Sequence, residues 1–228
     1  MNIKLIDITK IYNDGENKIE ALKGINLDIN EGDYIAFVGP SGSGKTTLLS
    51  IISGLIKPTR GDIYFDSKKL TKISDYYWST IRRKYFGLIF QKKVIIPHLT
   101  LIENIILPFI FSEQKILKID AIKRAEELLN EFDLYEKRNS LPSKLSGGEL
   151  QKLTILRAFI NNPKIIIADE PTGDLDINSS KKIVEIFKKF NKIKNLTIVM
   201  VTHNYELAKS AKTIYSLKEG RIDKILKG

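Results

Sequence analysis

The chain of 228 residues has no cysteine and only two histidines. The absence of cysteine excludes disulfide bonds and thiolate metal centres, and two histidines leave too few ligands for a typical zinc site. No apolar run approaches the roughly 20 residues that a membrane-spanning helix needs, and the N-terminus lacks the features of a secretory signal. We therefore expect a chain with one sizeable core that is soluble by itself and stays in the cytoplasm.

Acidic residues are fewer than basic ones. The chain has 27 aspartates and glutamates and 37 lysines and arginines, which gives a formal net charge of +10. Clustered cations favour nucleic-acid binding through phosphate contacts. Here the lysines are scattered and alternate with acids, as in residues 181–189, a pattern typical of a solvated helix face. Attraction to an anionic membrane surface is a second interpretation. We expect no nucleic-acid partner.

The chain is organised around the glycine-rich segment at residues 39–46, Gly-Pro-Ser-Gly-Ser-Gly-Lys-Thr. An apolar run precedes it at 34–38 and an amphipathic segment follows at 47–52, so strand, loop and helix succeed one another as a phosphate-binding loop requires. Glycines let the backbone wrap a phosphate chain at a positive helix N-terminus. A Gly/Ser-rich turn before a lysine is the alternative. We predict that Lys45 reaches the β- and γ-phosphates of a nucleotide and that Thr46 ligates Mg²⁺.

The predicted nucleotide contacts extend beyond this lysine. Those in and directly after the loop are Gly39, Ser41, Gly42, Ser43, Gly44, Lys45, Thr46 and Thr47. Tyr12, at the end of the first predicted strand, is a candidate for stacking on the base, because any purine offers a π-face. A purely structural packing role is the alternative for this tyrosine.

The hydrophobic pattern predicts an α/β fold in one domain, in which a helical insertion interrupts a mostly parallel core. Strands of a separate N-terminal antiparallel sheet are expected at 2–8, 24–29 and 61–66, with a polar loop after Tyr12. Helices are expected at 74–84, from Thr100 until a kink or end at Pro108, at 119–132, from Ser146 to before Pro163, and at 178–192. Strands of the core are expected at 86–90, 165–170 and 196–202, followed by a hairpin at 213–226. The core comprises 1–91 and 163–228, and the insertion comprises 92–162.

Polar side chains follow three of the core strands. Gln91 ends one strand, Asp169 and Glu170 end the next, and His203 follows the last. Ligands of parallel sheets bind at this carboxyl edge. Asp169 is predicted to hold Mg²⁺, Glu170 to polarise the water that attacks the γ-phosphate, and His203 to sense that phosphate. A strand that ends in a polar turn and a surface imidazole are the alternatives.

A second phosphate-ready surface is predicted where Leu-Ser-Gly-Gly-Glu, residues 145–149, opens a helix. Ser146 and Glu149 have capping-box spacing, so a well-capped helix is the simpler interpretation. Gly147 and Gly148 nevertheless expose backbone N–H groups at a positive helix end. One ATP does not need two such surfaces in one subunit, and the economical explanation is that this surface serves the nucleotide of a neighbour.

These motifs together resemble the ATPase subunits of ABC transporters over essentially the whole chain. Residues 39–46 resemble a Walker A loop, Gln91 a Q-loop, 145–149 the ABC signature, 165–170 a Walker B strand, 173–176 a D-loop and His203 the switch histidine. Residues 86–91, 96–104 and 168–176 resemble the lipoprotein-release, macrolide-export and cell-division subgroup. Relatives usually have Gln and Arg where this chain has Leu150 and Lys152, and often Asn in place of Asp174.

The resemblance implies a P-loop NTPase core with RecA-like architecture and an ATP-bound homodimer. In that dimer Ser146, Gly147, Gly148 and Glu149 of one subunit close on the ATP held by Lys45 of the other, and the loop that ends at Asp176 crosses the interface. The resemblance also implies that Gln91 is a catalytic residue, together with Lys45, Glu170 and His203. It further implies that Gln91 is a Mg²⁺ ligand, together with Thr46 and Asp169. Docking on an integral membrane permease is assigned to the helical insertion and the Gln91 region.

We therefore expect an ATPase that lies peripherally on the inner face of the cell membrane and drives a separate permease. Its cargo is expected to be a lipoprotein, peptide or drug that is exported or extracted. The alternative is an ATP-gated regulatory switch, as in the cell-division relatives, that moves no cargo. A nucleic-acid or ribosome-associated member is disfavoured, because such chains usually carry two ATPase cassettes or a long coiled-coil insertion.

Overall fold

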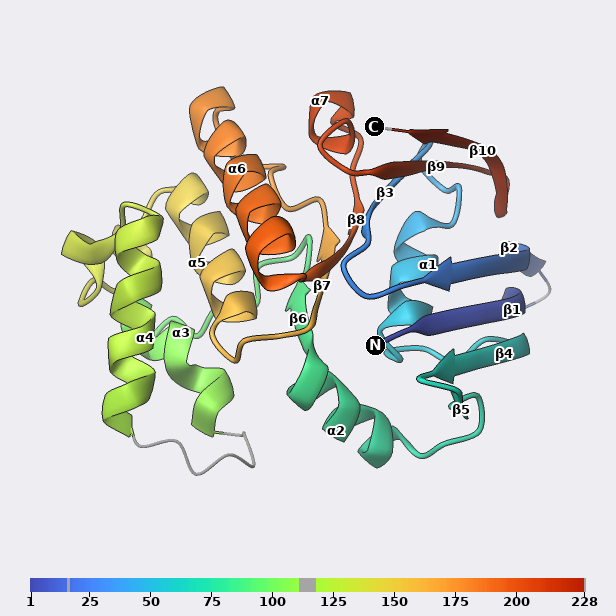
Figure 1. The fold of residues 1–228 in the computed structure, drawn as a ribbon, viewed down its shortest axis with the longest axis horizontal. Helices are drawn as coiled ribbons and strands as arrows, with labels where there is room; N and C mark the ends of the chain where they lie inside the picture. The colour runs from blue at the N-terminus through green and yellow to red at the C-terminus, as the bar shows by residue number, and fades with distance from the viewer. Residues whose placement is uncertain (16, 111–117, 228) are drawn as a thin grey trace.

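A computed structural model of the protein describes residues 1–15, 17–110 and 118–227 (Figure 1). In this part of the chain, one sheet is antiparallel and has the strand order β2-β1-β4-β5. Its strands are β1 (Ile3–Asp14), β2 (Asn17–Ile29), β4 (Arg60–Phe65) and β5 (Lys68–Lys69). Alternate side chains such as Ile3, Leu5 and Ile63 are buried beneath the sheet, as the period of two requires.

The second described sheet has the order β10-β9-β3-β8-β7-β6 and lies at the centre of the molecule. Its strands are β3 (Tyr34–Val38), β6 (Phe86–Ile89), β7 (Ile165–Asp169), β8 (Thr197–Val201), β9 (Thr213–Lys218) and β10 (Arg221–Lys227). All neighbours pair in parallel except β9 and β10, which form the predicted hairpin. The predicted fold class, a mostly parallel core with a separate antiparallel sheet, is confirmed.

Helices cover both faces of the central sheet. They are α1 (Lys45–Ile52), α2 (Asp75–Tyr85), α3 (Leu101–Ile110), α4 (Lys118–Glu131), α5 (Gly147–Phe159), α6 (Ile177–Lys194) and α7 (Tyr205–Ala208), with 3-10 turns at Tyr135–Lys137 and Pro142–Lys144. Both predicted capping boxes are present: Thr100 N donates to Glu103 Oε2 at 2.8 Å and Ser146 N to Glu149 Oε2 at 2.9 Å. None of the described helices is both long enough and apolar enough to span a membrane.

The structure differs from the expected elements in three places. The polar loop expected after Tyr12 is part of a β-hairpin, because β1 and β2 stay paired from Tyr12 and Ile19 out to Asp14 and Asn17. The helix that begins at Leu101 continues through Pro108 to Ile110, anchored by a buried face that includes Ile105. The short helix α7 was not predicted. Residues 111–117 of the predicted insertion lie outside the described residues.

Apolar side chains form two core clusters, one on each side of the central sheet. Alternate strand residues point to opposite clusters, as Ile166 and Ile167 do on β7. The first cluster joins the sheet to α3–α6, and Phe159 packs there with its ring centroid 4.8 Å from that of Phe190. The second joins the sheet to α1, α2 and the antiparallel sheet. This packing on both faces holds the carboxyl ends of the strands as a fixed frame for the loops that follow them.

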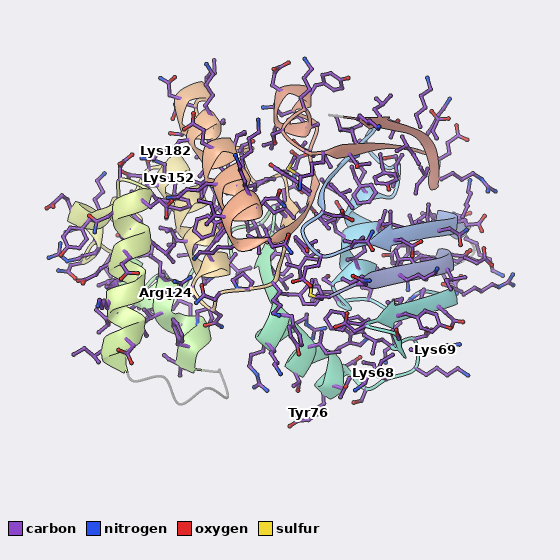
Figure 2. All side chains as sticks on the ribbon, in the orientation of Figure 1. Lys68, Lys69, Tyr76, Arg124, Lys152 and Lys182 are labelled. Carbon is purple, nitrogen blue, oxygen red and sulfur yellow. The ribbon has the colours of Figure 1, made fainter. Side chains whose placement is uncertain are left out.

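Charged side chains lie over the whole surface instead of forming one stripe. Figure 2 shows Lys68 and Lys69 on β5 at one end of the molecule and Arg124 and Lys182 on α4 and α6 at the other. Many are paired with acids, as Lys69 is with Asp62 at 2.7 Å. This distribution supports the interpretation of the net positive charge as solvated surface.

Candidate nucleotide-binding and catalytic site

The strand order places the predicted site residues at one edge of the central sheet. Strands β3, β8, β7 and β6 are parallel neighbours, so their carboxyl ends meet there. A cavity of about 580 Å³ opens at this edge. The predicted residues that line it are Tyr12, Gly39, Ser41, Gly42, Gly44, Lys45, Thr46, Thr47, Gln91, Asp169, Glu170 and His203. Predicted residues from five separate segments of the sequence are thus brought around a single cavity.

The glycine loop has a backbone that only glycine accommodates at its closest approaches. Gly44 has φ +99°, and a Cβ there would lie 2.4 Å from the carbonyl oxygen of Ala21. Gly39 has φ +151°, and its Cβ would lie 2.2 Å from the carbonyl oxygen of Leu217. The loop is therefore wedged between the β1–β2 hairpin and β9, which fixes its curvature. Ser43 differs from the other predicted loop residues, because its side chain is buried beneath the loop and does not line the cavity.

The Lys45 side chain curls back over this loop. Its Nζ donates hydrogen bonds to the carbonyl oxygens of Gly39 at 2.9 Å and Pro40 at 2.7 Å. Partial burial lowers the pKa of Lys45, and the nearby carboxylates of Asp169 and Glu170 oppose that shift. The ammonium group thus lies between the loop carbonyls and the two acids, inside the cavity that the loop encloses.

Three oxygen-bearing side chains of the cavity have the chemistry of a hard-cation site. Thr46 and Asp169 both line the cavity, and the Thr46 side chain lies close enough to the carboxylate to influence its pKa. Burial raises the pKa of Asp169, while Thr46 and Lys45 act in the opposite direction. The Thr46 hydroxyl, the Asp169 carboxylate and the amide oxygen of Gln91 are oxygen ligands, which Mg²⁺ prefers. No group of three or more His, Cys, Asp or Glu that could hold a metal occurs within residues 1–15, 17–110 and 118–227. The few oxygen donors present fit a Mg²⁺ that keeps water or phosphate ligands.

Glu170 is held by the strand next to its own. Its Oε1 lies 2.8 Å from His203 Nδ1 and accepts a hydrogen bond from His203 N at 2.9 Å, and its Oε2 accepts one from Thr202 Oγ1 at 3.2 Å. The Glu170 side chain is 13% exposed, whereas that of His203 is 76% exposed. Because Nδ1 faces this carboxylate, Nε2 is the ring nitrogen left to meet a ligand. The backbone of Glu170 has φ +50°, a strained value for this residue type.

The long β1–β2 hairpin adds an apolar wall that the sequence did not reveal. Tyr12 and Ile19 are cross-strand partners, 40% and 57% exposed, and both line the cavity with Ala21. Lys10 Nζ lies 5.1 Å from the centroid of the Tyr12 ring, a cation–π contact that orients the ring. The sequence pattern did not indicate Ile19 and Ala21 as site residues, because they lie beside Lys18 and Glu20 in a stretch that is mostly polar.

The remaining predicted contacts lie outside this cavity. Ser146, Gly147, Gly148 and Glu149 form the N-terminal turn of α5, where Ser146 is the N-cap. Asp176 is the N-cap of α6 and accepts hydrogen bonds from two backbone N–H groups, the nearer at 2.9 Å. Hydrogen bonds from Ser179 lower its pKa. The predicted site is therefore divided within one chain into a cavity and a separate helix tip.

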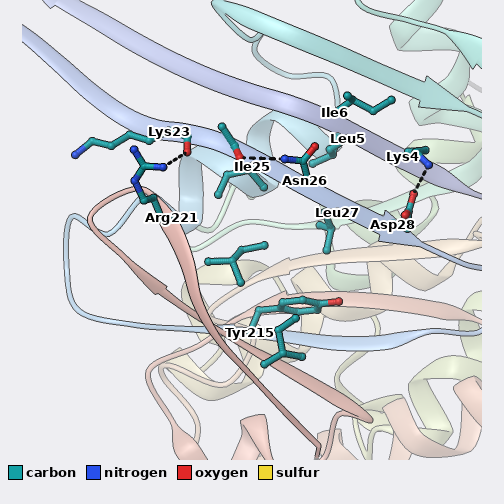
Figure 3. Close-up of a pocket in the computed structure, with 13 residues that line it drawn as sticks. Lys4, Leu5, Ile6, Lys23, Ile25, Asn26, Leu27, Asp28, Tyr215 and Arg221 are labelled. Atoms are coloured by element: carbon teal, nitrogen blue, oxygen red, sulfur yellow. Dashed lines mark hydrogen bonds and ion pairs between the residues drawn. The ribbon is translucent and has the colours of Figure 1, made fainter.

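A larger cavity, of about 700 Å³, lies between β2 and the β9–β10 hairpin (Figure 3). None of the predicted nucleotide contacts lines it. Its polar groups are largely paired with each other: Lys4 lies 3.6 Å from Asp28, and Arg221 Nη1 donates to the carbonyl oxygen of Lys23 at 3.4 Å. Size alone therefore does not identify the nucleotide site, whereas the chemistry of the lining residues does.

Comparisons with known proteins agree with this geometry. The model of the ABC transporter family matches residues 22–173, and the chain belongs to this family. It is an ATP-binding subunit of the ABC transporter type and an ATPase. The resemblance noted from the sequence is confirmed.

Particular relatives match along almost their whole length. MJ0796, an uncharacterized ABC transporter ATP-binding protein of Methanocaldococcus jannaschii, is 44% identical over 224 residues, 97% of this chain and 95% of the relative. The lipoprotein-releasing system ATP-binding protein LolD of Geobacter metallireducens is 38% identical over 96% of this chain and 97% of its own length. A dimeric structure of MJ0796 in a post-hydrolysis state, bound to ADP and Pi, has a TM-score of 0.94 and 42% identity over 99% of this chain and 98% of that one.

Proposed function

We propose that two copies of this chain sandwich two Mg-ATP molecules, close, hydrolyse the ATP and reopen, and that this cycle drives a separate membrane permease. The observation that carries the proposal is the division of the site. The cavity holds Lys45, Asp169 and Glu170, while the helix tip at Ser146 and Gly148 lies outside it. A second copy related by a two-fold axis supplies the helix tip that each cavity lacks.

The residues of the cavity then have distinct tasks. The loop N–H groups and Lys45 bind the phosphates, and Tyr12, with Ile19 beside it, contacts the base. Glu170 accepts a proton from the attacking water, and the hydrogen bonds from Thr202 and His203 hold its carboxylate in place. His203 contacts the γ-phosphate through Nε2. Lys45 must release the loop carbonyls of Gly39 and Pro40 to reach the nucleotide.

Thr46, Asp169 and Gln91 are the proposed holders of Mg²⁺. Thr46 and Asp169 both line the cavity, and the Thr46 side chain lies close enough to lower the pKa of Asp169. A bound Mg²⁺ neutralises phosphate charge and orients the γ-phosphate. The chain's own contribution is the half-buried carboxylate of Asp169, whose ionised form a cation would stabilise.

The helix tip provides the contacts across the interface. Ser146, Gly147, Gly148 and Glu149 present the positive end of α5 to the partner's γ-phosphate, and Asp176 lies on a loop that crosses the interface. ATP favours the closed dimer because only ATP bridges the two surfaces. The dimeric form of the similar MJ0796 cassette supports this arrangement.

Mixing two inactive variants tests whether the site is shared. Lys45→Ala and Ser146→Ala should each abolish most turnover when assayed alone. In the mixture, a heterodimer has one site with both defects and one intact site, so about a quarter of parental turnover should return if two-fold dimers exchange subunits at random. No recovery after verified exchange would contradict a site built from two subunits. Mixing Lys45→Ala with Glu170→Gln, whose defects both lie in the cavity, is the matched control and should restore nothing.

The proposal also includes a membrane permease as partner and a class of cargo. Relatives such as LolD support an inner-membrane assembly that exports or extracts a lipoprotein, peptide or drug, with the chain peripheral on the cytoplasmic face. Docking is assigned to the helical insertion and the segment after Gln91. Co-purification from native membranes should recover an integral membrane protein, and the cargo should raise the ATPase rate of the reconstituted pair. An unchanged rate with every cargo class would favour a switch without cargo.

A further inference from the structure

Lys93 joins three segments that are far apart in the sequence. It follows Gln91 by two residues, in the connection between β6 and α3. Its Nζ lies 2.7 Å from Asp174 Oδ2 and donates a hydrogen bond to the carbonyl oxygen of Gly147 at 3.1 Å. One ammonium group therefore contacts the loop after β7 and the first turn of α5 at the same time.

The lysine of this contact is better shielded than that of an ordinary surface pair. The Lys93 side chain is only 19% exposed, although that of Asp174 is 60% exposed. By contrast, Lys69 in the Lys69–Asp62 pair is 49% exposed at the same 2.7 Å distance. A lysine that is mostly buried must keep its partners, because an unpaired ammonium in such a place is costly.

The charges also explain why the pair has this composition. A cation beside the first turn of a helix is disfavoured by the positive end of the helix dipole. Lys93 lies at that end of α5, and the carboxylate of Asp174 offsets the repulsion. The Gly147 carbonyl supplies a second acceptor. Lys93 therefore depends on Asp174 at this position, whereas an acid beside this helix end is favourable in itself.

Packing beside the ion pair brings the same two segments together. A Cβ on Gly148 would lie 3.5 Å from Leu175 Cδ2 and 3.7 Å from the carbonyl oxygen of Asp174, so the loop rests against the helix tip. Deeper in, Gln151 Nε2 donates to the carbonyl oxygen of Pro171 at 3.0 Å. The loop between β7 and α6 is thus anchored at its base by Gln151 and at its exposed end by Lys93.

We propose that Lys93 is a positioning residue for the ATP-bound dimer. Its ammonium group holds the loop Gly173–Asp176 against the N-terminal turn of α5, so that both meet the partner subunit as one preformed surface. This inference rests on the proposed function, in which these two elements form the interface. A preformed surface loses less conformational entropy on association, so the tie strengthens dimer closure without touching the nucleotide.

The same contact links the interface to the segment after Gln91. Lys93 does not line the nucleotide cavity, whereas Gln91 does. A displacement of this segment by a docked permease therefore moves the helix tip and the loop through Lys93, and nucleotide binding by the single protomer stays unchanged. The expected signature is a change in dimerisation and in cooperativity towards ATP, with no change in protomer affinity.

The test measures the dimer dissociation constant in the hydrolysis-deficient Glu170→Gln background, by sedimentation velocity at saturating Mg-ATP. Lys93→Met should raise this constant about fivefold, as expected for a charged pair that is partly shielded from solvent. Lys93→Arg, which keeps the charge and the donors, should restore most of the loss. Lys69→Met, which breaks an equally short ion pair on β5, is the matched control and should leave the constant unchanged.

Asp174→Asn removes the same ion pair by changing its exposed member. This variant provides the test if Lys93→Met fails to fold. The double variant should dimerise no more weakly than Lys93→Met alone, since that variant has already lost the ion pair. Single effects that add fully, or a Lys93→Met dimer as tight as its parent, would overturn this inference and leave the proposed function intact. Failure of Glu170→Gln itself to dimerise at saturating Mg-ATP would overturn the proposed function and this inference together.

Discussion

His203 Nδ1 lies 2.8 Å from Glu170 Oε1, and the backbone N–H of His203 donates to the same oxygen at 2.9 Å. The two residues follow neighbouring strands, β7 and β8, so the sheet itself sets their separation. Glu170 has the strained φ of +50°, which turns its carboxylate toward the end of β8. The proposed base and the proposed phosphate sensor therefore form one hydrogen-bonded unit, and a change in either should be felt by the other.

Glu170→Gln should retain ATP binding and lose turnover. The amide keeps the size of the side chain but cannot accept a proton from water, so the rate should fall by about 10²- to 10⁴-fold, the range for general-base catalysis. Phosphate release at saturating ATP gives the rate, and equilibrium dialysis gives the affinity. Turnover within a few fold of the parent would remove Glu170 from this role.

His203→Ala should reduce turnover by about 10²-fold, because the carboxylate of Glu170 loses the neighbouring imidazole and the γ-phosphate loses Nε2. Stability should change by less than about 0.5 kcal/mol, since the imidazole is 76% exposed. His98→Ala is the natural control, because His98 is the other histidine and lies outside the cavity. Equal rates for the two variants would argue against a phosphate contact by His203.

Asp169→Asn should stabilise the nucleotide-free protein while it impairs hydrolysis. Burial raises the pKa of Asp169, so the folded state binds this proton more tightly than the unfolded state does. Its contribution to stability is then fully present below the unfolded pKa of about 3.9 and is lost as the pH rises through the folded pKa. At pH 7 the ionised carboxylate is a cost that asparagine avoids.

Urea denaturation from pH 4 to pH 7 measures this effect. Asp169→Asn should be more stable than the parent at pH 7, and the difference should shrink as the pH falls toward about 4, where the carboxyl takes up its proton. A variant that is less stable than the parent at pH 7 would show that the contacts of Asp169 with Lys45 and Thr46 outweigh its burial.

The variants Gly147→Ala and Gly44→Ala should have different defects: the first in dimer closure, the second in the protomer itself. A Cβ on Gly147 meets nothing within 4 Å, and this glycine does not have the left-handed backbone that strains other residues. The protomer should therefore fold and bind ATP normally, while the added methyl group obstructs the partner's phosphate and weakens the dimer. At Gly44 the Cβ would collide with the Ala21 carbonyl, so nucleotide binding by the protomer should itself be lost. Normal dimerisation of Gly147→Ala would place the interface elsewhere.

Much of the fold could be predicted because its signals are local. The alternation at Ile3 and Leu5 indicated a strand with one buried face, and the serine and glutamate at 146 and 149 indicated the start of a helix. The cavity also followed from local patterns. Once several parallel strands each end in a polar residue, the geometry of the sheet brings Gln91, Asp169 and His203 to one edge.

The features that were missed depend on contacts between distant segments. The outer part of the β1–β2 hairpin has few apolar residues besides Ile19, so its pattern resembles that of a loop, yet its backbone pairing continues. The contact of Lys93 with Asp174 and Gly147 joins residues 54 and more positions apart, and no spacing rule reports such a contact. Continuation of α3 past Pro108 reflects tertiary packing that outweighs local propensity.

A crystal structure of the Glu170→Gln variant grown with Mg-ATP tests the central claim most directly. The account predicts a two-fold dimer in which each triphosphate is bound by Lys45 of one protomer and lies within hydrogen-bond distance of Ser146 and Gly148 of the partner subunit. ATP bound in the cavity of separate protomers, or of protomers joined through another surface with the α5 tips far from any nucleotide, would contradict it.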